Sequence, residues 1–374
     1  MTTRLTKVCH VLHSLNVGGA EVLAARIARR LSDRFEFTFA CLDELGTLGR
    51  QLRQQGFTVE VIERRPGLDM SCARRLGRFV RSQGIQVLHA HQYTPFFYAM
   101  LSGVLRQRPP VLFTEHGRHF PDRRSRKRVL FNRFFLRKRD RVVGVGEAVR
   151  RALIDNEGIP PRRVGVVYNG VEISDFGRGA SQRHEVRREL NIHDDDPLLI
   201  QVARLDVLKD HGTALRAVAH LAARRPNVRL VLVGEGPEQA SIKAEIERLG
   251  IQSNVLLLGL RDDIARLLTA ADVFLLSSVS EGFPVTLIEA MLARVAVVST
   301  DVGGVAEVVA DGTTGLLTPS GDDQALAEAV ERLLDDESMR TQMAAAGQQR
   351  AVRIFSERQM HASYARQYRE MVGT

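Results

Sequence analysis

The chain has few of the features that would place it outside a cell. Its 374 residues include only three cysteines, Cys9, Cys41 and Cys72, which are widely spaced. An odd number of cysteines argues against a disulfide framework, and no spacing among them indicates a metal-ligand or redox pair. The cysteine content therefore favours a reducing compartment.

Long apolar runs are also missing, although a helix needs about 20 apolar residues to cross a bilayer. The first residues, MTTRLTKVCHVLHSL, contain only a short apolar run that His10 and His13 interrupt. No small-residue cleavage site follows, so this segment does not resemble a signal peptide. We expect a cytoplasmic protein, either free or bound peripherally at the inner face of the plasma membrane.

Acidic residues are scarce in the first half only. Residues 1–175 hold 31 Lys and Arg against 16 Asp and Glu, whereas the remainder of the chain carries a net charge of −6. This asymmetry predicts an anionic partner for the first half. A membrane surface and an anionic acceptor both fit, and nucleic acid fits less well because no RNA- or DNA-binding module is present.

Short β-branched runs alternate with stretches of helical periodicity along the whole chain. This alternation predicts βαβ units and parallel sheets buried on both faces, and the pattern restarts after a polar, Gly-rich linker at residues 170–182. We therefore predict an α/β protein of two Rossmann-like, doubly wound domains. The expected strands lie at residues 7–12, 35–42, 58–62, 87–90, 111–114, 141–145, 164–168, 197–203, 228–234, 255–259, 272–277, 295–300 and 315–318.

In such sheets, ligands bind beyond the carboxyl ends of the strands. In the first half, Gly18 and Gly19 follow the first strand, where glycine allows close approach of a ligand to a helix start. His116 follows the fifth strand. Taken alone, the glycines also fit a tight turn, and the histidine also fits a structural role.

Charged residues follow two strands of the second half. Arg204 and Lys209 stand in one loop and suit a diphosphate, since Arg grips two oxygens and Lys acts as a point charge. Glu281 stands in another loop, and Glu289 lies in the helix after it, where we expect a buried carboxylate that binds hydroxyl groups. The alternatives are a solvated basic loop and a core ion pair.

With these residues in view, the sequence resembles the retaining family-4 glycosyltransferases of the GT-B fold. EGFPVTLIEAM matches the E-x7-E motif of that family through Glu281 and Glu289, and RLDVLK matches its Arg-Lys motif. VGEGP, GGVAE and NVGGAE match three further Gly-rich turns. The resemblance covers nearly the whole chain.

The resemblance implies two domains that face each other across a cleft. Residues 1–172 would bind the acceptor and residues 173–355 the nucleotide sugar. A C-terminal helix at residues 356–374 would cross back to the first domain. The reaction would be retaining hexosyl transfer without a metal or another cofactor.

The resemblance also implies a role for each site residue. The predicted catalytic residues are His116 near the transferred sugar, Arg204 and Lys209 at the diphosphate, and Glu281 at sugar hydroxyls. The base would lie near residues 259–262, mostly against backbone. The predicted donor-binding residues are Gly18, Gly19, Arg204, Lys209, Gly234, Gly259, Arg261, Glu281, Gly282, Phe283, Pro284, Val285 and Glu289.

Two positions depart from the family pattern. Asp210 stands where the family usually has Gly after the Lys, and Arg294 begins a segment that replaces the commoner Gly-x-Pro. Both changes affect loop shape and leave the site charges in place. Elsewhere, His89 and His91 share a strand face, but no third zinc ligand is near them in sequence, so packing or acceptor contact is the better interpretation.

Residues 118–141 form the most basic stretch, with apolar residues at 129–131 and 134–136 among the arginines. A helix packed on the sheet with a solvated basic side explains this pattern. Contact with anionic lipid or a phosphorylated acceptor also explains it. For the whole chain, a sugar-nucleotide epimerase and a non-catalytic basic membrane- or nucleic-acid-binding protein stay open as alternatives to a transferase.

Overall fold

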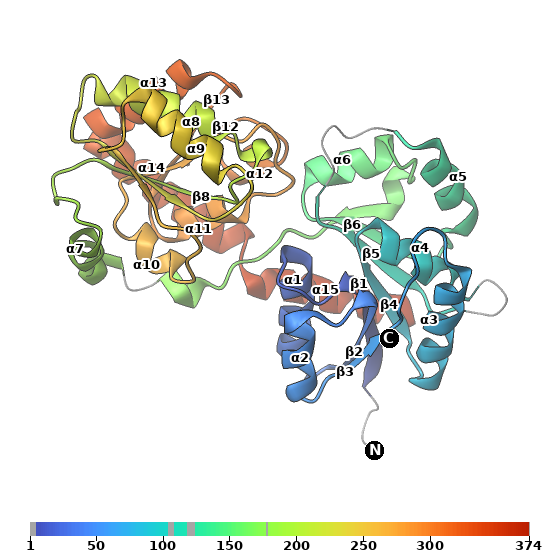
Figure 1. Ribbon diagram of the computed structural model, residues 1–374. Helices are drawn as coiled ribbons and strands as arrows, with labels where there is room; N and C mark the ends of the chain where they lie inside the picture. The colour runs from blue at the N-terminus through green and yellow to red at the C-terminus, as the bar shows by residue number, and fades with distance from the viewer. Residues whose placement is uncertain (1–4, 104–107, 118–123, 177–178, 374) are drawn as a thin grey trace. The chain divides into compact units, whose positions relative to one another are not determined.

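The computed structural model describes residues 5–103, 108–117, 124–176 and 179–373. They divide into two compact units (Figure 1). Unit 1 comprises Met1–Tyr168 with Arg358–Thr374, and unit 2 comprises Asn169–Glu357. Across the described residues, no helix combines the length and the apolarity needed to span a bilayer.

Unit 1 is built on a parallel sheet of order β3-β2-β1-β4-β5-β6-β7. Helices cover both of its faces (Figure 1). The strands are β1 (Thr6–Ser14), β2 (Phe35–Glu44), β3 (Thr58–Val61), β4 (Val87–His91), β5 (Val111–Glu115), β6 (Arg141–Gly144) and β7 (Val164–Val166). The helices are α1 (Gly19–Arg30), α2 (Gly46–Gln54), α3 (Met70–Ser82), α4 (Tyr93–Leu101), α5 (Arg126–Phe135), α6 (Glu147–Asp155), the 3-10 turn η1 (Pro161–Arg163) and α15 (Glu357–Val372).

The C-terminal helix α15 is part of the core of unit 1. Tyr364 and Tyr368 are fully buried and join one hydrophobic cluster with residues of β1, β2 and α1. Because strand side chains alternate between faces, the even-numbered residues of β1 and the odd-numbered residues of β4 point to this same side. The side of the sheet under α15 therefore carries His10, His89 and His91.

Unit 2 repeats the design with a parallel sheet of order β10-β9-β8-β11-β12-β13. Its strands are β8 (Leu198–Val202), β9 (Arg229–Val233), β10 (Val255–Leu257), β11 (Val273–Leu276), β12 (Ala296–Thr300) and β13 (Leu316–Thr318). Its helices are η2 (Ile173–Phe176), α7 (Gly179–Glu189), η3 (Val207–Lys209), α8 (His211–Ala222), α9 (Gln239–Leu249), α10 (Ile264–Leu268), α11 (Val285–Leu292), α12 (Val305–Val308), α13 (Asp323–Asp335) and α14 (Glu337–Ile354). The two predicted Rossmann-like domains are confirmed.

The predicted linker at residues 170–182 is wrong in part, because α7 begins inside it at Gly179. Tertiary contacts hold this polar helix. Val186 is fully buried, and the buried Arg187 guanidinium donates hydrogen bonds to the carbonyl oxygens of Ala270 and His193. Local composition does not reveal such contacts, so the segment looked like a connection without structure.

Candidate functional site

Each sheet has one point where the strand order reverses, and ligands bind at such points in doubly wound folds. In unit 1 the reversal lies between β1 and β4, and in unit 2 it lies between β8 and β11. The loops that follow these strands carry most of the predicted site residues.

The loop after β8 presents two cations. The Arg204 side chain is 71% exposed, and its closest carboxylate oxygen, on Asp206, is 3.9 Å away. The backbone then forms η3, which ends at Lys209, and Asp210 takes a left-handed conformation with φ of 42°. The Asp210 carboxylate caps α8 by accepting hydrogen bonds from the backbone N–H and the hydroxyl of Thr213. This cap fixes where the loop ends.

Lys209 forms an ion pair with Glu281 across the reversal point. Nζ of Lys209 lies 2.6 Å from Oε1 of Glu281, whose side chain is only 7% exposed. The Ser278 hydroxyl donates a second hydrogen bond to the same oxygen. Because a buried carboxylate needs such partners, the pair holds both side chains at the carboxyl edge of the sheet. No motif in the sequence points to Ser278, which becomes visible only through this hydrogen bond.

Backbone contacts join the two loops. The Val279 N–H donates to the Leu208 carbonyl oxygen at 2.9 Å, and the Ser277 hydroxyl donates to the Lys209 carbonyl oxygen at 2.9 Å. The cation and the carboxylate are therefore held by their main chains as well as by their own ion pair. This arrangement suits a preorganised electrostatic site.

The GGVAE turn supports this loop from the other side. A Cβ atom at Gly303 would lie 1.8 Å from the Glu281 carbonyl oxygen, and one at Gly304 would lie 2.3 Å from that of Gly282. The Gly304 N–H donates to the Glu281 carbonyl oxygen. Glycine is required here because two backbones touch, which gives the late Gly-rich motif a structural purpose.

The helix α11 begins directly after this loop. Pro284 precedes its first residue, Val285, and among the described residues no side chain caps this helix start. Phe283 is buried and packs edge-on against Phe355. Glu289 is half-buried rather than buried, which corrects one premise of the sequence argument. It lies on the second turn of α11, between the buried residues Ile288 and Ala290.

Three other predicted donor-binding residues lie on neighbouring turns. Gly234 has φ of 141°, and a Cβ atom there would lie 2.0 Å from the Ala203 carbonyl oxygen, so the β9 turn packs tightly on the loop after β8. Gly259 also has a positive φ, of 67°. The Arg261 guanidinium donates two hydrogen bonds of 2.7 Å to the carboxylate of Asp263. These hydrogen bonds raise the pKa of Arg261.

In unit 1, the loop after β1 leads into α1. Gly18 is the N-cap residue and Gly19 the first helical residue. A Cβ atom at Gly18 would lie 2.5 Å from a carboxylate oxygen of Glu21, so that side chain folds back over the helix start. Burial raises the pKa of Glu21. An anion arriving at this helix start would have to displace the Glu21 carboxylate.

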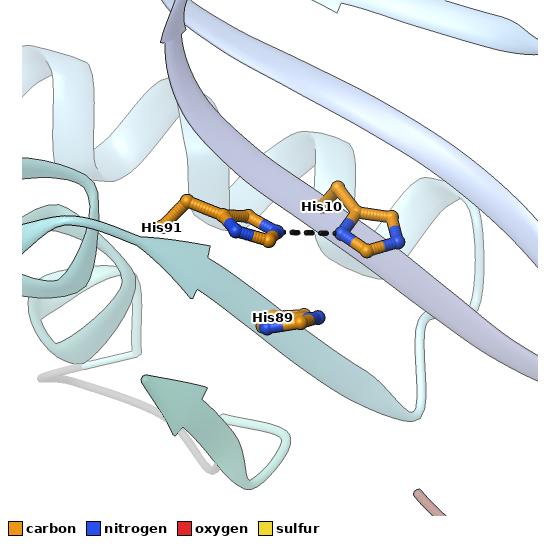
Figure 2. Close-up of side chains that lie close together, drawn as sticks. All are labelled: His10, His89 and His91. Atoms are coloured by element: carbon orange, nitrogen blue, oxygen red, sulfur yellow. Dashed lines mark hydrogen bonds between the residues drawn. The ribbon is translucent and has the colours of Figure 1, made fainter. Parts of the chain in front are cut away.

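Four histidines lie close together near the carboxyl edge of the unit 1 sheet. Nδ1 of His10 lies 2.8 Å from Nε2 of His91, and Nδ1 of His91 lies 2.9 Å from Nε2 of His116 (Figure 2 shows the first of these contacts). His89 lies beside His10 and His91 and contacts the Tyr368 hydroxyl at 2.7 Å and the Thr114 hydroxyl at 2.8 Å. His116 and the His89–His91 pair were predictable from their places on the strands, whereas His10 joins them only through the β1–β4 register.

The three histidines of Figure 2 are close enough to be considered as metal ligands, because one nitrogen of each lies within 4.8 Å of the others. Their hydrogen bonds argue against that use. His10 and His91 point nitrogens at each other, and both nitrogens of His89 face hydroxyl groups. A metal needs all three lone pairs directed at one point.

Comparison with known proteins identifies the family. A model of the Glycosyltransferase Family 4 domain matches residues 17–175, and a model of Glycosyl transferases group 1 matches residues 182–350. The chain belongs to the family-4-type glycosyltransferases of the GT-B fold. In this glycosyltransferase, the Lys209–Glu281 pair lies inside the group 1 region and the histidines from His89 to His116 lie inside the family 4 region.

Several relatives of this glycosyltransferase are similar over long stretches. N-acetyl-alpha-D-glucosaminyl L-malate synthase from Bacillus anthracis is 27% identical, over 82% of this chain and 80% of its own. The crystal structure of HepE from Anabaena in complex with UDP is 25% identical, covers 96% of this chain and 99% of its own, and has a TM-score of 0.85. N-acetylgalactosamine-N,N'-diacetylbacillosaminyl-diphospho-undecaprenol 4-alpha-N-acetylgalactosaminyltransferase from Campylobacter jejuni is 29% identical, over 50% of this chain and 49% of its own.

Proposed function

We propose that this glycosyltransferase transfers a hexose from a nucleotide sugar to a glycan or lipid-linked acceptor in polysaccharide or glycolipid synthesis, with retention of the anomeric configuration. The observation that carries the proposal is the Lys209–Glu281 ion pair at the reversal point of the unit 2 sheet, with Arg204 in the same loop. A UDP-sugar is the favoured donor, since HepE binds UDP, and a GDP-sugar is the alternative.

Each site residue has a part in the proposed reaction. The bond between the sugar and the diphosphate breaks, the nucleoside diphosphate leaves, and an acceptor hydroxyl attacks the same face of the sugar. The proton of that hydroxyl passes to the departing phosphate oxygen. Negative charge grows on the phosphate oxygens, where Arg204 and Lys209 stabilise it most. Glu281 binds hydroxyl groups of the sugar, Glu289 binds the ribose, and His116 lies near the transferred sugar.

The same charges support a reaction without a metal. Two cations in one loop supply the positive charge that a divalent ion provides at other diphosphate sites. We therefore expect turnover to be unchanged by an excess of EDTA. A loss of turnover that Mg²⁺ or Mn²⁺ restores would contradict this part of the proposal.

A thermal-shift panel of UDP, GDP and ADP with their sugars tests the donor. A ligand that binds only the folded state raises the melting temperature. We expect UDP and one UDP-sugar to give the largest shifts, and a GDP pair in their place would change the base assignment. An epimerase would interconvert the free sugar nucleotides without an acceptor, and a non-catalytic protein would leave them intact.

We also propose that α5 meets an anionic lipid surface. Its residues divide into two faces: Phe131 packs on Phe97 of α4, whereas Leu130 and Phe134 are 57% and 73% exposed. With Arg126 and Arg133, Leu130 lines an open pocket of about 560 Å³. Residues 118–123 of the predicted surface lie outside the described part of the chain. Exposed apolar residues flanked by arginines suit an interface with acidic lipid.

Co-sedimentation with vesicles separates this role from simple packing. We expect the protein to bind vesicles that contain acidic lipid, and the Leu130→Gln/Phe134→Gln variant to lose most of that binding. Leu260→Gln is the matched control, because Leu260 is 76% exposed on unit 2. Equal binding to neutral vesicles, or none to acidic ones, would remove the proposal.

A further inference from the structure

His10, His91 and His116 form a hydrogen-bonded relay that runs from the interior of unit 1 to the carboxyl edge of its sheet. His10 is fully buried on β1, His91 is buried at the end of β4, and His116 is half-buried just after β5. The two contacts of 2.8 and 2.9 Å join each Nδ1 to the Nε2 of the next ring. The relay therefore has an inner end, Nε2 of His10, and an outer end, Nδ1 of His116.

All three rings are neutral at physiological pH. Burial lowers the pKa of His10 to about 3 and that of His116 to about 4, and it lowers the pKa of His91 well below 6.5. A neutral imidazole has one N–H and one bare nitrogen. The relay can thus run in only two directions, with every ring protonated at Nδ1 or every ring protonated at Nε2.

The inner end distinguishes the two directions. Nε2 of His10 is buried and has no hydrogen-bond partner among the described residues. If the rings were protonated at Nε2, this atom would be a buried N–H without an acceptor, a rarer defect in proteins than a buried acceptor without a donor.

The two phenyl rings that stack on His10 offer this N–H no acceptor. Phe37 and Phe39 stack on His10 with interplanar angles of 21°, so their faces meet the imidazole face and not its edge. An N–H bond lies in the plane of its ring, so neither phenyl ring can accept a hydrogen bond from it. The arrangement of lower free energy therefore leaves Nε2 of His10 without a proton.

From this arrangement we propose that His10 and His91 are positioning residues that hold His116 in the Nδ1–H tautomer. His10 donates from Nδ1 to His91, and His91 donates from Nδ1 to His116. His116 then presents an N–H donor at the carboxyl edge, suited to a hydroxyl or phosphate oxygen, and it does not act there as a base. This inference deepens the proposed function and rests on it only for the identity of the ligand.

Nitrogen NMR of the full chain tests the relay without any ligand. Long-range ¹H–¹⁵N spectra of ¹⁵N-histidine-labelled protein distinguish protonated from bare ring nitrogens, and His116→Gln assigns the His116 signals. We expect Nδ1 to be protonated in His10, His91 and His116. A bare Nδ1 in wild-type His116 would overturn the proposal, as would stoichiometric zinc bound at these rings in the purified protein.

Two matched variants test which residues do the positioning. His91→Phe removes the donor to His116, so His116 should shift to the Nε2–H form that an unconstrained histidine favours. His89→Phe alters a ring just as buried, whose centroid is 4.1 Å from that of His91, but leaves the relay intact. It should keep His116 in the Nδ1–H form. An unshifted tautomer in His91→Phe would refute the role of His91.

The relay and the proposed function can fail separately. If the spectra show the expected tautomer and no sugar nucleotide raises the melting temperature, the transferase proposal fails and the relay stands. If a nucleotide binds and wild-type His116 carries its proton on Nε2, the relay fails and the transferase proposal stands.

Discussion

Two residues that depart from the family pattern share one backbone feature. Asp210 and Arg294 stand where the resemblance to the family leads us to expect glycine, and both have left-handed backbones, with φ of 42° and 59°. Glycine adopts this region without strain, whereas other L-residues do so at a cost of about 1–2 kcal/mol. Asp210 offsets the cost by capping α8, while the Arg294 side chain is exposed.

This contrast predicts that glycine stabilises the protein at Arg294 but has little net effect at Asp210. Arg294→Gly relieves the strained backbone, but glycine also raises the conformational entropy of the unfolded chain, which offsets part of this gain. The free energy of unfolding should therefore rise by up to about 1 kcal/mol. Asp210→Gly relieves the same strain but also removes the cap, so the two effects should largely cancel and the free energy of unfolding should change by roughly a few tenths of a kcal/mol. Urea denaturation measures both, and an Arg294→Gly protein less stable than wild type would contradict the interpretation.

Lys209 is the residue on which turnover should depend most. Lys209→Ala should reduce turnover by roughly 10²–10³-fold, the usual effect of losing one preorganised electrostatic contact in a transition state. Steady-state kinetics with the donor found by thermal shift measures this. Lys243→Ala, which removes an exposed charge on α9, should have no effect. Near-normal turnover in Lys209→Ala would refute the assigned role.

At the residue scale, the sequence predicted the charges of the site but not their partners. Spacing placed Lys209 and Glu281 beyond the ends of two strands, and the strand order then brought those strands together. The ion pair itself and the Ser278 hydroxyl depend on side-chain conformations. Sequence patterns do not specify such conformations.

At the scale of elements, the site depends on loops that touch through glycine. The turn at Gly303 packs on the backbone of Glu281, and the turn at Gly234 packs on that of Ala203. These contacts hold the loop after β9 against the loop after β8, and the loop after β12 against the loop after β11. The Gly-rich motifs, each of which is a weak signal in the sequence, thus hold in place the loops that carry the charged residues.

A pair of glycine variants isolates this contact. Gly303 and Gly312 both have positive φ, of 55° and 67°, but only at Gly303 would a Cβ atom meet another backbone. Gly303→Ala should therefore lower the free energy of unfolding by about 1–3 kcal/mol more than Gly312→Ala does, and it should also weaken nucleotide binding. Chemical denaturation and calorimetry measure the two effects. Equal losses in both variants would show that the contact is unimportant.

Strands and most helices were predictable because their periodicity is strong. The start of α7 was not, since its polar sequence is held by Val186 and Arg187 through contacts with distant segments. Similarly, the sequence places apolar residues among the arginines of α5 but does not show which of them are buried, and packing on α4 divides them into an inner and an exposed side. Local sequence patterns predict whether an element is a helix or a strand more reliably than they predict which residues it contacts.

At the scale of the whole molecule, α15 returns to unit 1 and closes the core over the histidines. Tyr368, 279 residues after His89, contacts its ring nitrogen. No local pattern links these two residues, so the sequence could not reveal that His89 is buried beneath the C-terminal helix. The meeting of His10 and His91 likewise needed the order of the strands.

The buried histidines predict how stability depends on pH. Because burial lowers the pKa of His10 from 6.5 to about 3, the unfolded chain takes up this proton first as the pH falls. The stability that the neutral ring contributes is present above pH 6.5 and is lost as the pH falls toward 3. Each such histidine contributes a slope of about 1.4 kcal/mol per pH unit.

His10→Phe keeps the stack on Phe37 and Phe39 but removes one of these titrations. Between pH 6 and 4, the free energy of unfolding of the variant should therefore fall with a smaller slope than that of wild type. The difference between the two slopes should be about 1.4 kcal/mol per pH unit. Urea denaturation at several pH values measures the slopes. Parallel curves for the two proteins would mean that His10 is not buried as a neutral ring.

The most direct test of the central claim is calorimetric titration of the nucleoside diphosphate selected by the thermal-shift panel, and of its nucleoside, into wild type, Lys209→Ala and Lys243→Ala. If Lys209 and Arg204 grip the diphosphate, Lys209→Ala should bind the nucleoside diphosphate at least about tenfold more weakly, a loss of about 1.4 kcal/mol. Its affinity for the nucleoside should equal that of wild type, and Lys243→Ala should match wild type for both ligands. Unchanged affinity of Lys209→Ala for the nucleoside diphosphate would contradict the account.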